Sequence, residues 1–476
     1  MVNQNNKEIY VSEETKKYLK EKYPAIWGKI KKDLENTEEK FNKNQEWASF
    51  QNYSIFLNTI GEKIYFENPD KGTYRQFIDD SNINKTYLNI LKDSNIFENI
   101  TVNELDKKIV KEIPARKTLF LCANGRLVKN SQVASYNLLI NDEAGTGKDY
   151  VTSKTLDIIP DEQYVKKTRI SPTVFTYWHN SFYEPDWTWD GKVFYTEDIS
   201  EAVLNSEVFK VMCSSGSEAT IVKNQRAIEI SINGKPVIIT TTANSIPSAE
   251  LTRRFEIVNL DESLNQTREI MKRHCEYAEK GITPDLNEDI KNAMKFLKRV
   301  NVTIPFAKNL YLLFPPESVM MRTKFPRFLD LIKASTALHQ FQRKWTSKDT
   351  VVAERRDYEI ATEVMEKIAS NKYLVSLTRN QKKIMEFIEK KTDKDENFKA
   401  NATKIRSLMN NFISVPAMYT NLSQLTSYGL LKSELKEDDR GRETEYYYLS
   451  EIISNGIHKI VFPKFEDLDK GEENEG

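Results

Sequence analysis

Asn141-Asp-Glu-Ala-Gly-Thr-Gly-Lys148-Asp149 is a polar, glycine-containing stretch that lies between two segments with regular patterns. Before it comes Tyr136-Asn-Leu-Leu-Ile140, a short apolar run that predicts a buried strand. After it comes Tyr150-Val-Thr-Ser-Lys-Thr-Leu-Asp-Ile-Ile159, whose apolar residues recur at helical spacing. Glycine readily adopts the backbone angles of a tight turn, so we expect a strand, a turn and a helix in succession.

This succession, with a lysine at the start of the helix, is the layout of a phosphate-binding P-loop. The backbone N–H groups of such a loop and the helix N-terminus bind phosphate, and Lys148 would reach the outer phosphates of ATP. The consensus has Gly where Asp142 stands, and Ser or Thr where Asp149 stands, although an aspartate can still bind Mg²⁺. Taken alone, the stretch could be a chance Gly-Thr-Gly-Lys turn. The candidate ATP-binding residues are Glu143, Ala144, Gly145, Thr146, Gly147, Lys148, Asp149 and Tyr150, and Asp149 is also a candidate metal ligand.

Two adjacent acids end a second apolar run, Lys192-Val-Phe-Tyr-Thr-Glu197-Asp198. Nucleotide hydrolases need one acid near the magnesium ion and another that orients and deprotonates the attacking water. We assign Glu197 to the metal and Asp198 to the water, with the two roles open to sharing. Many strands end in acids, so the position of this pair, about 50 residues after the P-loop lysine, is what makes it informative.

A β-hairpin is predicted at Ala219–Ile230, because its two arms alternate and Lys223-Asn-Gln-Arg226 forms a polar, basic tip. Its candidate DNA-binding residues are Lys223, Asn224 and Arg226; the alternative is an ordinary solvated turn. A further strand, Lys235–Asn244, ends in a residue that could position the lytic water. The pair Arg253-Arg254 follows it.

The order of these motifs resembles that of the AAA+ ATPases of the helicase clade, the group that holds MCM-like and superfamily 3 helicases of mobile elements. The resemblance implies that Asn244 is the sensor 1 residue and that Arg254, or Arg253, is an arginine finger that reaches the neighbouring subunit's ATP. A structural arginine that caps its own turn is the alternative. It also implies that Lys223 enters a central channel and contacts DNA.

The chain after residue 260 contains helices and then a second small module. Arg327 lies near Pro326, where a helix through Arg343 is expected to begin, and it resembles the sensor 2 arginine of an MCM-like lid, with Arg322 as second choice. Residues 377–450 have the pattern of a winged helix, with wing strands at 430–435 and 444–449. Its third helix, 416–429, contains no Lys or Arg, so it could contact either duplex DNA or protein.

The predicted architecture is an α/β AAA+ core with helices on both faces of a parallel sheet. We expect a helical N-terminal domain at 1–110, the ATPase core at 111–275, a helical lid at 276–372, a winged helix at 373–460 and an acidic, disordered tail at 461–476. Thr118–Cys122 is also strand-like by its apolar run.

The chain has 70 Lys+Arg and 70 Asp+Glu among 476 residues, so any nucleic-acid binding must use local basic patches. The three cysteines have no zinc or disulfide spacing, and we expect no membrane span and a cytoplasmic location.

Together these features predict a ring-forming DNA helicase that uses ATP and Mg²⁺ on single- and double-stranded DNA. The resemblance implies a homo-oligomer, specifically a hexamer. A separate primase or initiator would be a partner, since no primase motif is visible. An AAA+ replication initiator or helicase loader without processive unwinding is the alternative, and a catalytically silent DNA-binding scaffold is a third.

Overall fold

The computed structural model describes residues 20, 83–132, 135–142, 145–178, 184, 186–213, 217–223, 226–242, 254–313, 321–368, 377–437, 443–450, 462, 464, 465 and 468. The chain divides into two compact units, one of Met1–Leu91 with Trp345–Thr350 and the other of Lys92–Lys344 with Val351–Gly476. Of the smaller unit, the structure describes most of helix α5 (Lys85–Lys92) and strand β9 (Trp345–Ser347). Most of the N-terminal domain predicted at 1–110 lies outside the described residues.

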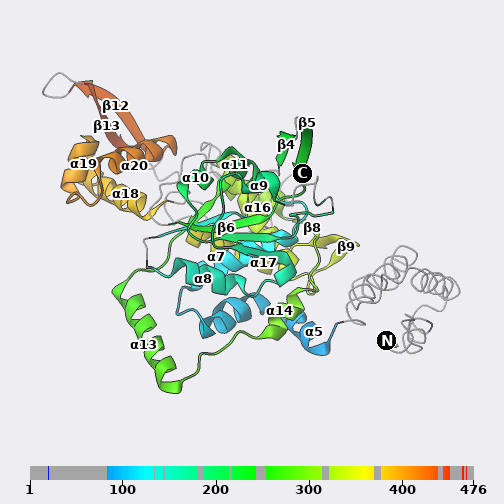
Figure 1. The fold of residues 1–476 in the computed structure, drawn as a ribbon. Coiled ribbons are helices and arrows are strands. Elements are labelled where there is room, and N and C mark those ends of the chain that lie inside the picture. Colours follow the sequence, from blue (N-terminus) through cyan, green and yellow to red (C-terminus); the bar gives the residue numbers. More distant parts are fainter. Residues whose placement is uncertain are drawn as a thin grey trace, which may run out of the picture. The chain divides into compact units, whose positions relative to one another are not determined.

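A five-stranded parallel sheet forms the centre of the larger unit (Figure 1). Its order is β2-β3-β6-β1-β7, so the chain crosses over repeatedly between neighbouring strands. Strands β1, β3, β6 and β7 are buried along their whole length, as expected where both faces of a parallel sheet are covered. The predicted α/β class is therefore confirmed. The strands are β1 Leu138–Asn141, β2 Tyr164–Lys167, β3 Val193–Thr196, β6 Val237–Thr242 and β7 Glu256–Val258.

Helix α7 (Ile113–Asn124) corrects one expectation, because Thr118–Cys122 was predicted as strand-like. All but its first two residues are buried, and it packs against α8, α16 and α17. A helix that is covered on all sides has no polar face, and its continuous apolar run cannot be told from a buried strand by periodicity. Pro114, in the first helical turn, is the local signal for this helix.

The other helices of the larger unit surround the sheet and continue beyond it. The chain reaches α7 through α6 (Ile96–Glu98), η2 (Asn99–Glu104) and η3 (Leu105–Lys107), and leaves it through η4 (Gly125–Leu127). Those that follow sheet strands are α8 (Lys148–Leu156), η5 (Asp161–Gln163), α9 (Val174–Tyr177), α10 (Glu201–Leu204) and α11 (Glu207–Met212). Those after β7 are α13 (Leu264–Lys280), α14 (Glu288–Met294), α15 (Ala307–Leu310), η6 (Tyr311–Leu313), α16 (Met321–Leu338) and α17 (Arg355–Ile368), with short strands β8 (Asn301–Thr303) and β10 (Thr350–Val352).

Helix α16 contains Pro326 rather than beginning there. Proline lacks an N–H and therefore costs the helix one hydrogen bond, which is why the sequence pattern places a boundary at this residue. The structure instead shows a full helical turn before it.

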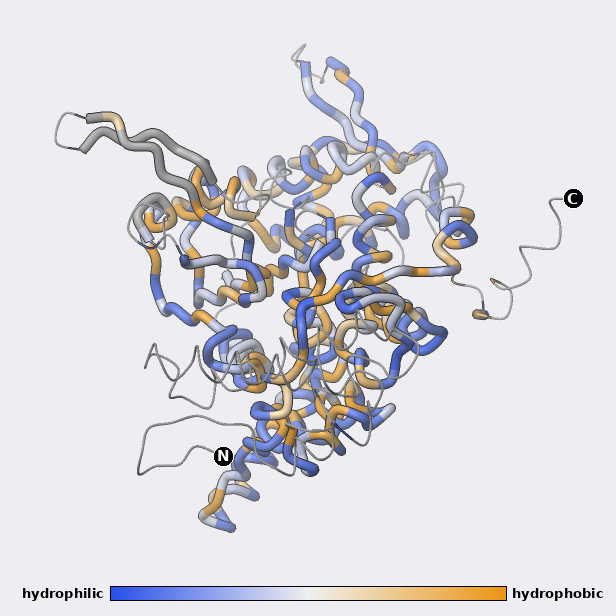
Figure 2. The backbone as a smooth tube through the Cα atoms, turned by 90° about the vertical axis from the view of Figure 1, so that its right-hand side faces the viewer, coloured by the Kyte–Doolittle hydropathy of each residue, from blue (hydrophilic) through white to orange (hydrophobic). Residues whose placement is uncertain are grey.

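An aromatic cluster fills the space under strand β3. The ring centroid of Phe175 lies 5.2 Å from that of Phe194 and 5.7 Å from that of Trp189. Both contacts are edge-to-face, and all three rings are fully buried. The hydropathy colouring shows the same concentration of apolar residues inside the core and polar residues at its surface (Figure 2). This cluster fixes the end of the loop that leads into β3, and thereby the strand that Glu197 follows.

Strands β4 (Ser217–Lys223) and β5 (Arg226–Ile232) form the predicted hairpin as an antiparallel pair. Lys223 pairs with Arg226 at its end. The hairpin stands away from the parallel sheet (Figure 1).

Residues 377–449 form three helices and a three-stranded antiparallel sheet with the order β11-β13-β12. They bury an apolar cluster of their own that includes Ile384, Leu422 and Tyr447. This arrangement has the elements expected of a winged helix in the expected order, and that assignment stays a prediction. The elements are α18 Arg379–Thr392, β11 Ala400–Asn401, α19 Ala402–Leu408, α20 Val415–Ser427, β12 Leu431–Glu437 and β13 Glu443–Leu449. None of the described helices is long and apolar enough to cross a lipid bilayer.

Candidate nucleotide site

The loop between β1 and α8 has the backbone shape that phosphate binding needs. Gly145 and Gly147 have φ angles of +88° and +84°, a region that residues with a Cβ rarely adopt. Gly147 is the N-cap of α8, so the first free N–H groups of the helix face the loop. Lys148, the first helical residue, is only 5% exposed. Glu143 and Ala144 lie outside the described residues.

Asp142, at the position where the consensus has glycine, anchors the base of the loop. Its carboxylate is buried and accepts a 2.8 Å hydrogen bond from the backbone N–H of Leu260, after β7. Burial raises the pKa of Asp142 to about 6. The neighbouring Asn259 donates to the carbonyl of Asn141 at 2.8 Å and accepts from Lys382 of α18 at 2.8 Å. The departure from the consensus therefore has a structural role, tying the loop to the segment that follows β7.

The acid pair follows directly after β3, as predicted. Glu197 forms an ion pair with Lys166 of β2 at 2.7 Å. Asp198 has a φ of +41°, in the left-handed region, and its backbone N–H donates to the hydroxyl of Thr241 at 2.8 Å. Backbone strain of this kind at a non-glycine residue persists where surrounding contacts hold it, here the hydrogen bond to β6.

Thr241 connects the two motifs. It lies on β6, between β1 and β3, and is fully buried. Its hydroxyl donates to the carboxylate of Asp149 while it accepts from Asp198. The hydroxyl of Tyr195 also lies 3.5 Å from that carboxylate. The P-loop helix and the acid pair are thus neighbours at the carboxyl edge of the sheet, the edge where parallel α/β sheets bind ligands.

A hollow of about 600 Å³ opens beside the acid pair. Its lining includes Arg169, Glu197, Asp198 and Thr242. Sequence reasoning missed Thr241, Tyr195, Lys166 and Arg169 as members of this region. The run Thr240-Thr241-Thr242 at the end of a buried strand was the one available signal, because buried hydroxyls need partners.

The donor set fits a magnesium ion that is shared with a nucleotide. Within the described part of the chain, no three His, Cys, Asp or Glu side chains are grouped closely enough to hold a metal ion alone. Mg²⁺ usually takes only one or two protein carboxylates and completes its shell with phosphate oxygens and water. Asp149 and Glu197 at one edge of the sheet suit that pattern.

Within one chain, the predicted arginines Arg254 and Arg327 bind groups outside the nucleotide site. The Arg254 guanidinium donates to the carbonyl of Lys210, at the end of α11. Arg327 is 3% exposed, pairs with Glu256 of β7 and donates to the carbonyl of Ser135 at 3.1 Å. Lys324 pairs with the same Glu256 carboxylate at 2.5 Å.

The remaining predicted residues are described incompletely or not at all. Lys223 and Arg226 are placed only by their strands. Asn224, Asn244 and Arg253 lie outside the described residues.

A family model described as the MTBMA_p00010 P-loop domain matches residues 81–300. This range covers the glycine loop, the acid pair, the hairpin and all five strands of the parallel sheet. No curated protein matches the chain. The family match and the parallel sheet together fit a P-loop NTPase core, which points to nucleotide binding or hydrolysis.

Proposed function

We propose that this protein is an ATP-dependent, ring-forming DNA helicase of the replicative, mobile-element type. The observation that carries the ATPase part is the Thr241 hydroxyl, which holds Asp149 of the P-loop helix beside Asp198. Phosphate-binding backbone, lysine and acids then share one edge of the sheet, where bound Mg²⁺ would neutralise phosphate charge.

The proposed roles of the chain's own groups follow from their positions. The loop N–H groups and Lys148 would bind and orient the β- and γ-phosphates. Asp149 and Glu197 would hold the magnesium ion, and Asp198 would accept the proton of the attacking water. Asn244, after β6, would orient that water, because β6 lies between the P-loop strand and the acid strand.

The DNA part of the proposal depends on the β4–β5 hairpin. Its end pairs two basic residues, Lys223 and Arg226, and it stands clear of the sheet (Figure 1). Basic tips of this kind bind a phosphate backbone without reading its sequence. By the resemblance to MCM-like and superfamily 3 helicases, such a hairpin would lie in the channel of a hexamer. Arg254 or Arg253, and the lid arginine Arg327, would then complete a neighbour's site, which for Arg327 requires release from Glu256.

Replacing Lys148 with Ala tests the nucleotide site. We expect Mg²⁺-dependent ATP hydrolysis to fall at least about a hundredfold, because the outer phosphates lose a buried cation. Lys154→Ala is the matched control, since Lys154 lies on the same helix but pairs with Asp157 at 2.8 Å on its surface. Undiminished turnover in Lys148→Ala would remove the site assignment.

The second candidate is an AAA+ replication initiator or helicase loader, which the three-helix module at 377–449 favours. Strand displacement on a forked duplex separates the two functions. A helicase with Lys223→Ala should keep its basal ATPase and lose unwinding, whereas Lys280→Ala, at the exposed end of α13, should change neither. ATP hydrolysis by the wild type without any displacement would favour the initiator.

A further inference from the structure

A second, smaller cavity lies at the opposite edge of the parallel sheet from the P-loop. Its lining includes Tyr136 and Asn137, which precede β1, Gly191, which precedes β3, and Pro236, which precedes β6. Because these strands are parallel, positions before their starts share the amino edge, whereas Lys148 and Asp198 follow strand ends. The cavity is therefore separate from the nucleotide site.

Arg126, in the η4 turn, lines this cavity and is an anomaly in the core. It is 3% exposed, yet within the described part of the chain it donates only to neutral oxygens: Gln163 Oε1 at 2.9 Å, the carbonyl of Ala123 at 3.2 Å and Asn124 Oδ1 at 3.1 Å. Its Nη2 has no hydrogen-bond partner among the described residues. Burial lowers the pKa of Arg126 to about 9, and no carboxylate in the described part of the chain opposes that shift. A buried cation without a counter-charge is costly, which points to an anion that completes the site.

The other charged residues around the cavity are mostly basic. Lys129, Lys235 and Arg299 line it, and Asp190 is the one acid among the described residues of the lining. Asp190 is already engaged, by Arg299 Nη1 at 3.1 Å and the backbone N–H of Lys235 at 3.2 Å.

Two further groups define the local charge. Burial lowers the pKa of Lys235, and Asp330 and Asp190 oppose this effect only in part. The Asp330 carboxylate already binds Lys333 at 2.8 Å and the backbone N–H of Gln132 at 2.7 Å. The Nε of Arg299 is buried without a hydrogen-bond partner among the described residues. Around the cavity, positive charge therefore exceeds negative charge among the described residues, and two guanidinium groups have donors without a partner among them.

The volume is sufficient for a small ion. The cavity offers about 100 Å³, several times the space that one ordered water needs on the same measure. A tetrahedral oxyanion fits this space. We propose that the cavity binds a phosphate-sized oxyanion, held by Arg126 with Lys235 and Arg299 at the amino edge of the sheet. Arginine donors in a planar fork suit phosphate oxygens.

The test titrates inorganic phosphate into the full-length Lys148→Ala protein at constant ionic strength, with chloride as the reference anion, and follows thermal unfolding and binding heat. The Lys148→Ala background removes the main P-loop phosphate contact, so the outcome does not depend on ATP hydrolysis. We expect saturable stabilisation that Arg126→Met weakens at least about tenfold. Arg116→Met is the control, because Arg116 is equally buried but has Asp106 as a partner at 3.5 Å, and it should keep the phosphate response.

A second variant should strengthen phosphate binding, where Arg126→Met weakens it. Asp190→Asn removes the one lining acid and frees Arg299, so phosphate should bind several-fold more tightly, and this holds even if Arg126→Met fails to fold. A phosphate response that neither substitution changes, or no response beyond chloride, would overturn the proposal. A different outcome is that a single-stranded oligonucleotide stabilises the protein where inorganic phosphate does not, and that Arg126→Met abolishes that stabilisation. This result would overturn the proposal that the site binds a free oxyanion and would assign it to a phosphate of a nucleic acid.

Discussion

Thr241 is the residue on which the geometry of the nucleotide site depends most directly. Its hydroxyl has two partners, the carboxylate of Asp149 and the backbone N–H of Asp198. Thr241→Val keeps the shape but removes the hydroxyl that links Asp149 to the backbone of Asp198, and a hydrogen bond to a charged group contributes about 1.5–3 kcal/mol. We therefore expect kcat for ATP to fall about 10- to 100-fold, with a smaller change in KM, as measured by steady-state phosphate release.

Thr240→Val provides the matched control for this prediction. Thr240 is equally buried on the same strand, but its hydroxyl donates to the carbonyl of Thr196 at 2.9 Å and does not contact Asp149. If both valine variants lose the same activity, Thr241 acts only through packing.

Some residues of the nucleotide site could be predicted from the sequence, and others could not. Lys148, Asp149, Glu197 and Asp198 were predictable as neighbours, because residues after parallel strands meet at one edge. Thr241 was not, since its role requires knowing that β6 inserts between β1 and β3. Asp142 departs from the consensus for a reason visible only in three dimensions, its bond to Leu260.

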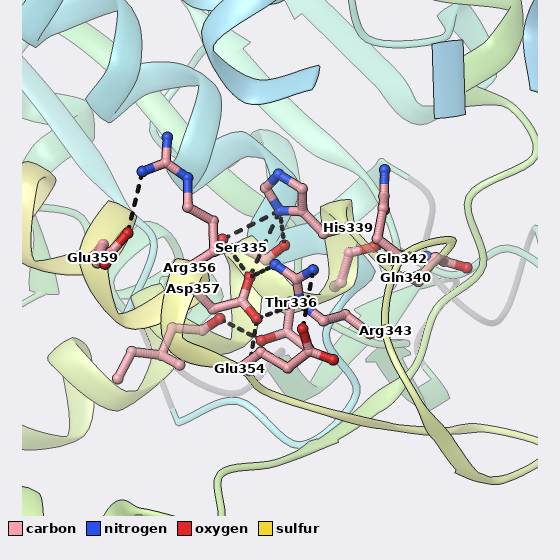
Figure 3. A network of polar contacts seen from close by, with 12 residues as sticks. Ser335, Thr336, His339, Gln340, Gln342, Arg343, Glu354, Arg356, Asp357 and Glu359 are labelled. Carbon is pink, nitrogen blue, oxygen red and sulfur yellow. Dashed lines mark hydrogen bonds and ion pairs between the residues drawn. The ribbon is translucent and has the colours of Figure 1, made fainter. Parts of the chain in front are cut away.

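At the scale of elements, α16 and α17 are joined by a buried polar network (Figure 3). Asp357 accepts hydrogen bonds from Arg343 at 2.7 and 2.9 Å and from the hydroxyl of Ser335 at 2.7 Å. His339, fully buried beside them, has an Nδ1 that lies 2.8 Å from the carbonyl of Ser335. Burial lowers the pKa of His339 to about 4 despite the opposing effect of Asp357.

This lowered pKa predicts an acid sensitivity with a definite sign. Between about pH 6.5 and 4 the unfolded chain binds a proton at His339 that the folded chain does not, so folding free energy is lost as the pH falls. From pH 7 to 5 this contribution is about 2 kcal/mol. Glu112 and Asp142, whose pKa values burial raises to about 7 and about 6, act in the opposite direction.

A comparison of wild type with His339→Gln isolates the histidine from those carboxyls. Urea unfolding at pH 7 and pH 5 should show that the wild type loses about 2 kcal/mol more than the variant. Equal losses in the two proteins would mean that His339 is protonated in the folded state.

Elements with one face in solvent are the ones that sequence patterns predict correctly. The hairpin β4–β5 and helix α13 were predictable, because alternation and helical periodicity survive where one face meets solvent. Helix α7 was not, because burial on all sides removes the polar face that marks a helix.

At the scale of the whole molecule, the proposal requires an active site completed by a second subunit. In one chain the Arg254 guanidinium binds the carbonyl of Lys210, and Arg327 binds Glu256. The proposal therefore predicts that ATP analogue and Mg²⁺ convert the purified chain to a hexamer, which mass photometry would resolve. A protein that stays monomeric with nucleotide and DNA present contradicts it.

Subunit mixing then tests whether the finger acts in trans. Lys148→Ala and Arg254→Ala should each be nearly inactive alone, since every interface lacks one essential group. In a ring built from equal amounts of both, about a quarter of the interfaces, one half times one half, pair an intact P-loop with an intact finger. Mixing should therefore restore ATPase activity. When either variant is mixed with the double variant Lys148→Ala/Arg254→Ala, every interface lacks an intact P-loop lysine or an intact finger, so no activity should return. Absence of recovery, with rings formed, would mean that Arg254 serves its own chain by holding the end of α11, and that the neighbour's contribution must come from another residue.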